Sequence, residues 1–220
     1  SREKSSWIPV DLSKGSEASQ MGTIQGMRNV DSPLRLALMP YVSGYVNSYD
    51  SNVGYSFSGG LDLKLGLSET YTLDMTLIPD FGQTKTDDLI LNLKPQETYY
   101  SENRPFFTEG TELFTKCGLF YSRRIGKTPE LYGQVIENSS LAGYEILKNP
   151  STARLVNAFK ISGRGKNNLA VGVFNAVTAN TWAKIAYEEA EPELILTEPA
   201  ANYNMFVLDQ TIGKNSYVNF

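Results

Sequence analysis

Strict alternation of apolar and polar side chains over long stretches is the feature that most limits how this chain can fold. In residues 34–48 and 53–67, leucine, valine and aromatic residues recur at nearly every second position, and Gly, Ser and single charges fill many of the places between them. A third such stretch, 71–78, follows after a short turn. A period of two puts successive side chains on opposite faces of a β-strand. We therefore predict a three-stranded antiparallel meander over 34–78.

Strand length separates the two β-folds that this alternation allows. A soluble sandwich also alternates apolar and polar residues, but its strands usually have about 5–6 residues. The two long stretches instead match membrane strands, with small polar residues facing a wet interior and aromatic residues near the ends of the apolar face. We predict the all-β class, as part of an antiparallel transmembrane β-barrel. The side chains expected to face lipid are Leu61, Leu63, Leu65, Leu73, Met75 and Leu77, and those on the opposite face include Asp62, Lys64 and Asp74.

Two further hairpins are predicted in the second half of the chain. One pairs residues 153–163 with 168–179, and the other pairs 203–211 with 215–220; both have turns rich in Gly and Asn. Residues 182–201, between the hairpins, carry five glutamates, and we expect a long extracellular loop there. Short turns at one end and long loops at the other are typical of outer-membrane barrels.

Residues 80–151 show neither strand nor helix periodicity. They interleave aromatic, acidic and arginine residues, and a long irregular stretch within a compact domain is usually functional. Such backbone is tolerated at membrane depth only inside protein or along a water-filled cavity. We therefore expect an insert that plugs the lumen or covers its mouth. Buried charges must be paired, so Arg104, Arg123 and Arg124 are expected to meet carboxylates there.

Composition excludes several classes of function. The 20 Lys and Arg against 24 Asp and Glu give a net charge of −4, which offers no electrostatic footprint for nucleic acid. The chain has no His, which excludes Ser-His and Cys-His catalysis. Its single cysteine, Cys117, excludes an internal disulfide and a thiolate metal cluster. No stretch reaches the ~18 consecutive apolar residues that a membrane helix needs.

Three short motifs in the first half of the chain are distinctive. They are residues 78–83 (IPDFGQ) with Asp87 and Asp88, residues 102–110 (ENRPFFTEG), and residues 120–126 (FYSRRIG). In order and spacing these motifs resemble the segments NPDFSQVEAD, EKRPFFLEG and FYSRRIG of a large uncharacterised family from Bacteroidota.

The resemblance implies a location and an architecture. In that family, an amino-terminal domain like carbohydrate-binding module family 9 precedes an outer-membrane β-barrel. Residues 1–33 are accordingly expected to be a linker after such a module. Residues 34–220 are expected to form the amino-terminal part of the barrel, with 80–151 as a lumenal or extracellular insert. The chain would then be a fragment of a longer protein in the outer membrane of a Gram-negative cell.

The acidic residues of the insert have two interpretations each. Asp80, Asp87 and Asp88 are oxygen ligands suited to Ca²⁺, or they lie in a solvated loop or pair with arginines. We favour the second interpretation; Gly82 and Lys85 also depart from the family pattern, where Ser and an acid are usual. Glu102 and Glu109 resemble a glycosidase pair only in residue type. We expect neighbouring arginines to lower the pKa values of these carboxylates, which is the wrong direction for a general acid.

The arginines and phenylalanines of the insert are the other candidates. Arg123 and Arg124 either line a constriction that selects anions or belong to a lumenal lattice of salt bridges. Phe106 and Phe107 either stack on a sugar ring or anchor the insert to the barrel wall. The complete candidate set is Asp80, Asp87, Asp88, Glu102, Arg104, Glu109, Arg123 and Arg124, with Phe106 and Phe107.

Two functions fit this sequence. The first is a plugged or gated barrel that binds or transports a solute, with glycans as the candidate ligand. The alternative is a structural anchor within a larger outer-membrane complex. The expected partners are the lipid bilayer, other outer-membrane proteins and a glycan, but no nucleic acid. We expect no catalytic residue in this chain, no metal site and no cofactor, with Ca²⁺ the one ion to consider.

Overall fold

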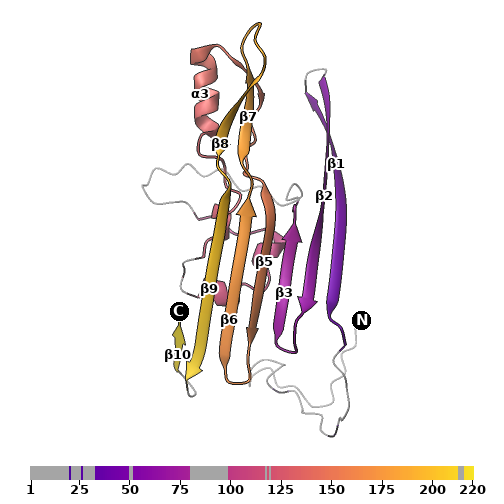
Figure 1. Ribbon diagram of the computed structural model, residues 1–220, viewed down its shortest axis with the longest axis vertical. Coiled ribbons are helices and arrows are strands. Elements are labelled where there is room, and N and C mark those ends of the chain that lie inside the picture. Colours follow the sequence, from indigo (N-terminus) through magenta and orange to yellow (C-terminus); the bar gives the residue numbers. More distant parts are fainter. Residues whose placement is uncertain are drawn as a thin grey trace. The chain divides into compact units, whose positions relative to one another are not determined.

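The computed structural model describes residues 33–49, 52–79, 99–116, 118, 120–212 and 216–220, together with Gln20 and Gly26. The chain divides into two units, Ser1–Pro33 and Leu34–Phe220, and every element named below belongs to the second. This unit consists mostly of antiparallel β-strands, with a few short helices (Figure 1). The prediction of an all-β chain is confirmed.

Seven strands form one antiparallel sheet. In spatial order they are β1 (Leu36–Tyr49), β2 (Asn52–Gly66), β3 (Tyr71–Leu77), β5 (Leu155–Arg164), β6 (Leu169–Thr178), β9 (Ala201–Ile212) and β10 (Ser216–Asn219). The predicted meander and both predicted hairpins are therefore confirmed. Among the described residues this sheet is open, because its edge strands β1 and β10 each pair with a single neighbour.

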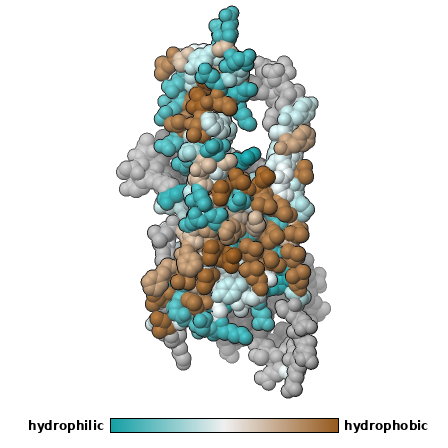
Figure 2. Space-filling view, in the orientation of Figure 1, coloured by the Kyte–Doolittle hydropathy of each residue, from teal (hydrophilic) through white to brown (hydrophobic). Residues whose placement is uncertain are grey.

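The strand register gives the large sheet one apolar face. Leu63 pairs with Met75, and Lys64 pairs with Asp74, so apolar and charged residues lie on opposite faces, as the alternation predicted. We call the first the apolar face and the second the charged face. In Figure 2, hydrophobic side chains form a broad band across these strands. The apolar face carries Leu61, Leu63, Leu65, Leu73, Met75, Leu77, Phe159, Ile161, Val171, Val173, Phe206 and Leu208.

A short segment packs on the charged face and forms the main core. This covering segment, the described residues of 99–126, contains α1 (Pro105–Thr108), α2 (Glu112–Thr115) and the 3-10 helix η3 (Ser122–Arg124). None of the helices among the described residues is long and apolar enough to cross a membrane. The core consists of Phe107, Phe114 and Ile125 from the covering segment, and Leu155, Ala158, Phe174, Ala176 and Val207 from the sheet or its edge.

Small residues on the charged face make this packing possible. Ala158, Ala170 and Ala176 are completely or almost completely buried, and Gly172 lies beneath the ring of Phe114. A Cβ atom at Gly172 would come within 3.0 Å of that ring, so a larger residue would push the ring away. The small residues that suggested a wet face in the sequence therefore also provide room for aromatic side chains.

A second, three-stranded sheet forms a separate core. Its strands are β4 (Glu145–Lys148), β7 (Thr181–Ala186) and β8 (Glu193–Glu198), in the order β4-β7-β8. The helix α3 (Tyr132–Ala142) ends at Gly143, whose φ of +68° is readily adopted by glycine. Residues from α3 and this sheet pack together, and the buried ones are Val135, Tyr144, Ala183 and Ile185.

The expectation of a long loop over 182–201 is wrong. Its two ends form β7 and β8, because TWAKIA and ELILTE each place apolar residues, Ala183, Ile185 and Ile195, where they reach the second core. Four of the five glutamates lie in the turn between these strands or beside it at the start of β8, whereas Glu198, at the end of β8, is buried. The expectation rested on the number of acidic residues, and it missed two short alternating strands, which the turn 187–192 connects.

The predicted insert over 80–151 is not irregular throughout its described part. Residues 132–148 form α3 and β4 and belong to the second core, whereas the covering segment belongs to the first. Alternation over four residues in β4 is too short to be recognised in a sequence. Helix α3 is only weakly amphipathic, so its pattern gave no clear signal either.

Candidate functional site

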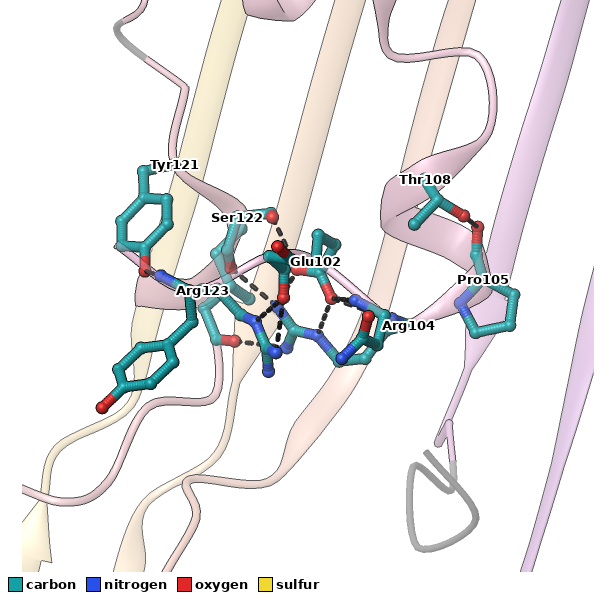
Figure 3. Close-up of polar contacts among 11 residues, drawn as sticks. Glu102, Arg104, Pro105, Thr108, Tyr121, Ser122 and Arg123 are labelled. Carbon is teal, nitrogen blue, oxygen red and sulfur yellow. Dashed lines mark hydrogen bonds and ion pairs between the residues drawn. The ribbon is translucent and has the colours of Figure 1, made fainter. Parts of the chain in front are cut away.

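An ion pair ties together two of the distinctive motifs, residues 102–110 and 120–126. Glu102 accepts hydrogen bonds from the Arg104 side chain at 2.9 Å (Nε to Oε1) and 2.7 Å (Nη2 to Oε2). The Ser122 hydroxyl donates to the same carboxylate at 2.5 Å. Figure 3 shows these three side chains meeting between the two backbone segments. The carboxylate therefore joins both ends of the covering segment.

Arg104 uses its remaining donors to hold the backbone of the second motif. Its Nη1 donates to the carbonyl oxygen of Ile125 at 2.6 Å, and its Nη2 donates to that of Ser122 at 2.8 Å. The guanidinium also lies 4.2 Å from the ring centre of Phe107. Only 6% of Arg104 is exposed. A planar guanidinium suits several fixed acceptors at once, which a lysine ammonium does not.

The surroundings of Glu102 keep its carboxylate ionised. Burial alone would raise the pKa of Glu102, but hydrogen bonds from Arg104 and Ser122 and the positive charge of Arg104 outweigh burial, so this pKa lies below its ordinary value of 4.5. The direction agrees with the sequence-based expectation for carboxylates among arginines. An ionised carboxylate accepts hydrogen bonds but has no proton to donate, so Glu102 is suited to holding structure together.

Acidification is expected to weaken the covering segment through Glu102. Because the pKa of Glu102 is lower in the folded chain, its stabilising contribution is complete above about pH 4.5 and is lost as the pH falls through the folded-state value. Urea unfolding measured from pH 7 to pH 3 should show a smaller loss of free energy for Glu102→Gln than for the unaltered chain. Glu137→Gln, at an exposed position on α3, is the control. Parallel pH profiles for all three proteins would contradict the assignment.

A buried lysine on the charged face holds the end of α1. Lys160, on β5, is 2% exposed and donates hydrogen bonds to the carbonyl oxygens of Phe106 and Glu109. Its ammonium also lies 4.4 Å from the ring centre of Phe106 and 3.8 Å from Asp74. Carbonyl groups at the end of a helix attract cations. Lys160 therefore connects the sheet to the backbone of the covering segment.

A second lysine adds an exposed ion pair beside Lys160. Lys64, on β2, contacts Glu109 at 2.7 Å and Asp74 at 3.8 Å. The hydrogen bond and the positive charge from Lys64 lower the pKa of Glu109. Glu109 is largely exposed, so this ion pair contributes little stability on its own. Lys64, Lys160, Asp74 and Glu109 therefore form a charge network of two cations and two anions.

A cavity of about 200 Å³ lies at this charge network. Met39, Asp62, Asp74, Phe106 and Lys160 are among its lining residues. The oxygen Oδ1 of Asp74 is buried and has no hydrogen-bond partner among the described residues. Most of the cavity's lining surface is apolar, but charged groups of Lys64, Asp74 and Lys160 border it. It has room for an ordered water molecule beside Asp74, which is the usual way to satisfy such an atom.

The other end of the covering segment is fixed by a buried aspartate. Asp209, on β9, is fully buried and forms ion pairs with Lys116, which follows α2, and with Arg164 at the end of β5. Asn219 on β10 also lies 3.5 Å from this carboxylate. Removing one partner of a buried ion pair leaves an uncompensated charge, so Asp209 couples the covering segment to three strands.

The predicted site residues are found in several environments. Glu102 and Arg104 form the central ion pair, whereas Glu109 pairs with Lys64 instead of an arginine. Arg123 donates to the carbonyl oxygen of Ser101, and the guanidinium of Arg124 lies 5.7 Å from the ring centre of Tyr121. The remaining three candidates, Asp80, Asp87 and Asp88, lie outside the described residues.

Phe106 and Phe107 act as anchors in this arrangement. Phe107 is buried against Phe174 of the sheet, with ring centres 6.3 Å apart, and Phe106 packs on the edge of the same core. Of the two interpretations drawn from the sequence, packing against the wall agrees with these contacts. No group of three or more potential ligands within the described ranges is arranged to hold a metal ion.

Several residues of these contacts escaped sequence analysis. Three of them lie on strands as single charges among small or apolar neighbours, and two lie in the covering segment itself. Nothing local to the sequence shows which of these residues will meet. A lone charge on the polar face of a long strand is the one available signal, and Asp62, Lys64 and Asp74 did carry it. The missed residues are Ser122, Lys116, Lys160, Arg164 and Asp209.

Together, the fold and these contacts define a mostly β domain in which a compact, charged segment covers one face of a long-stranded antiparallel sheet. Residues 32–220 match the family described as a domain of unknown function, DUF5916. Because this match spans most of the chain, the protein belongs to the DUF5916 family. Comparison with curated proteins and with solved structures gives no match.

Proposed function

We propose that residues 34–220 form part of the wall of an outer-membrane β-barrel and that the covering segment is its plug. The protein would bind or transport a solute, with a glycan as the candidate, through a lumen that the plug closes at rest. The observation that carries this proposal is the contrast between the two faces of the large sheet. One face is apolar and no described residue covers it, and the other is charged and covered by residues of 99–126.

The apolar face supports contact with lipid. Val42 is 84% exposed, Phe57 is 82% exposed and Tyr55 is 70% exposed, although side chains of this kind are normally buried. The apolar face also ends at different register rows on different strands. On β2 it extends to Tyr55, whereas on β9 the same face becomes polar at Asn204, in the register row of Leu63. Strands that are tilted in a membrane produce this displacement.

The charged face supports a lumenal plug. Lys160 and Asp209 would be too costly to bury without partners, and the covering segment provides contacts for both. The connections also differ between the two ends of the sheet. Residues 67–70 and 165–168 are short turns at one end, whereas two of the three connections at the other end, 78–154 and 179–200, are long; the third joins β1 to β2. Outer-membrane barrels have this asymmetry, with the longer segments outside the cell. The motif resemblance to outer-membrane proteins of Bacteroidota favours the same location.

Conductance across planar bilayers tests the plug with the full-length protein. We expect the unaltered protein to open rarely. Phe114→Ala should raise the open probability about 100-fold or more, because losing a buried phenylalanine costs about 3–5 kcal/mol and ~1.4 kcal/mol changes an equilibrium tenfold. Leu141→Ala, at an 85% exposed position on α3, is the matched control and should behave like the unaltered protein.

The possible results separate the plug from its alternatives. A protein that inserts but stays silent in both variants would contradict transport and favour a structural anchor. An unaltered protein that is already fully open would show that the covering segment does not close the lumen. Opening in Phe114→Ala alone would support the proposal.

A further inference from the structure

The small sheet β4-β7-β8 has one face that no described residue covers. Its other face packs on α3 through Ala183 and Ile185. On the uncovered face, Trp182 is 42% exposed and pairs across the strands with Leu196. Large exposed apolar residues grouped in this way mark interaction sites. We call Trp182, Lys184, Leu194, Leu196 and Lys148 the Trp182 face.

Two lysines on the Trp182 face are register partners. Lys148 on β4 pairs with Lys184 on β7 just after a register shift in β4 between Ile146 and Lys148. Ile146 and Ile185 pack in the second core, whereas both lysines are exposed. Cβ atoms of such partners are about 5 Å apart, and like charges at this distance repel. Both side chains are exposed, and among the described residues neither ammonium has an ion-pair or hydrogen-bond partner. An anion bound between the two ammonium groups would attract both of them and offset their mutual repulsion.

The residue types along this hairpin change in a definite order. Asparagines come first, beyond Val173 on the apolar face of β6; the side-chain amide of Asn175 donates to Asn202 and Asn204. Trp182 and then Lys184 follow on β7. The glutamates of the connecting turn 187–192 are farthest from the apolar face. With increasing distance from the apolar face, the hairpin therefore presents amide, aromatic, cationic and finally acidic groups.

The distance of the lysines from the apolar face selects the type of anion. Lys184 lies nine residues beyond Asn175, which is in the register row where this face becomes polar. That is about 30 Å of extended chain and about 21 Å above the membrane core for a 45° tilt. The headgroup layer of a phospholipid is only about 5–8 Å thick. Phospholipid phosphates would therefore lie below the lysines, whereas the sugars of a glycolipid with a long saccharide would reach them.

We infer that the Trp182 face binds the anionic saccharide of an outer-leaflet glycolipid. Trp182 would stack on a sugar ring, and Lys148 and Lys184 would hold a phosphate or carboxylate substituent between them. This inference rests on the proposed function, because it needs the apolar face to lie in the membrane with β7 and β8 outside the cell. The acidic turn then projects beyond the bound saccharide, away from its negative charges.

Glycolipid binding to the full-length protein tests this inference. The probes are vesicles that contain a glycolipid with a phosphorylated oligosaccharide, and matched vesicles in which the same lipid anchor lacks the oligosaccharide. Removing both charges in Lys148→Gln/Lys184→Gln should weaken binding of the first probe about 10- to 30-fold, at about one order of magnitude or less per lysine near a charged surface. Trp182→Ala should weaken it as well. Lys166→Gln, at the exposed turn between β5 and β6, is the matched control and should bind normally.

Two further measurements make the outcome decisive. Flotation with the vesicles reports insertion, which all variants should retain; an unaltered protein that fails to insert contradicts the proposed function and this inference with it. Insertion with equal glycolipid binding by all variants, or equal binding of both probes, contradicts this inference alone.

Without glycolipid, the Lys148→Gln/Lys184→Gln variant should melt at the same temperature as the unaltered protein or higher, since the repulsion between the two lysines is removed. A lower melting temperature would instead indicate a purely structural role for the lysine pair.

Discussion

Replacing Arg104 by alanine is expected to lower the free energy of unfolding of the domain by about 3–5 kcal/mol, the usual effect of removing one partner from a buried ion pair. The loss would leave the Glu102 carboxylate buried without its main counter-charge and the carbonyl group of Ile125 without the Arg104 donor. The carbonyl group of Ser122 would keep only the backbone N–H of Ile125 as a donor. Urea unfolding at pH 7 measures this change. Arg154→Ala, at an exposed position before β5, should change the free energy by only about 0.5 kcal/mol or less.

A lysine at position 104 distinguishes the geometry of the contact from its charge. Arg104→Lys keeps the positive charge but cannot reach the Glu102 carboxylate and both carbonyl groups together. We therefore expect this variant to recover only a small part of the lost stability. Full recovery would show that the charge alone matters. An Arg104→Ala protein as stable as Arg154→Ala would contradict the central position of this ion pair.

The strands of this protein could be predicted from sequence because their signal is local. Alternation continues through more than ten residues in β1 and β2, so the bounds Leu36–Tyr49 and Asn52–Gly66 lie within two residues of the predicted 34–48 and 53–67. Period-two patterns also fix which residues share a face, as the pairing of Lys64 with Asp74 illustrates. Shorter strands such as β4 and β7 lack enough repeats to produce the same signal.

The contacts of the covering segment could be predicted only in part. Arg104 was expected to meet a carboxylate, and Glu102, two residues before it, is the one that it meets. In contrast, Lys160 and Asp209 reach the covering segment across about 50 and 90 residues of sequence. No local pattern specifies such distant contacts, because they depend on which strands are neighbours and on where the covering segment lies.

An arginine in the middle of the apolar face is expected to have a large effect that depends on its depth. Leu61, on β2, lies six residues from both Tyr55 on the same strand and Leu67, which directly follows the strand's end at Gly66. These two residues mark the ends of the apolar stretch. If lipid surrounds this face, Leu61→Arg should cost about 2–4 kcal/mol, whereas Leu67→Arg, near the interface, should cost about 0–1 kcal/mol. Urea unfolding of the full-length protein in phosphatidylcholine vesicles measures both values.

The two leucine variants make the same chemical change at two depths, within β2 and directly after its last residue, Gly66. Both substitutions remove the same side chain and introduce the same charge, and Leu67 is already 50% exposed. In lipid, the guanidinium introduced by Leu67→Arg would reach the polar headgroups, because long basic side chains extend toward the interface, while the middle of the face offers no such partner. Equal costs at both positions would contradict burial of the apolar face in a bilayer. A cost at Leu61 that persists in vesicle-free, detergent-free solution would show that protein, and not lipid, covers this face.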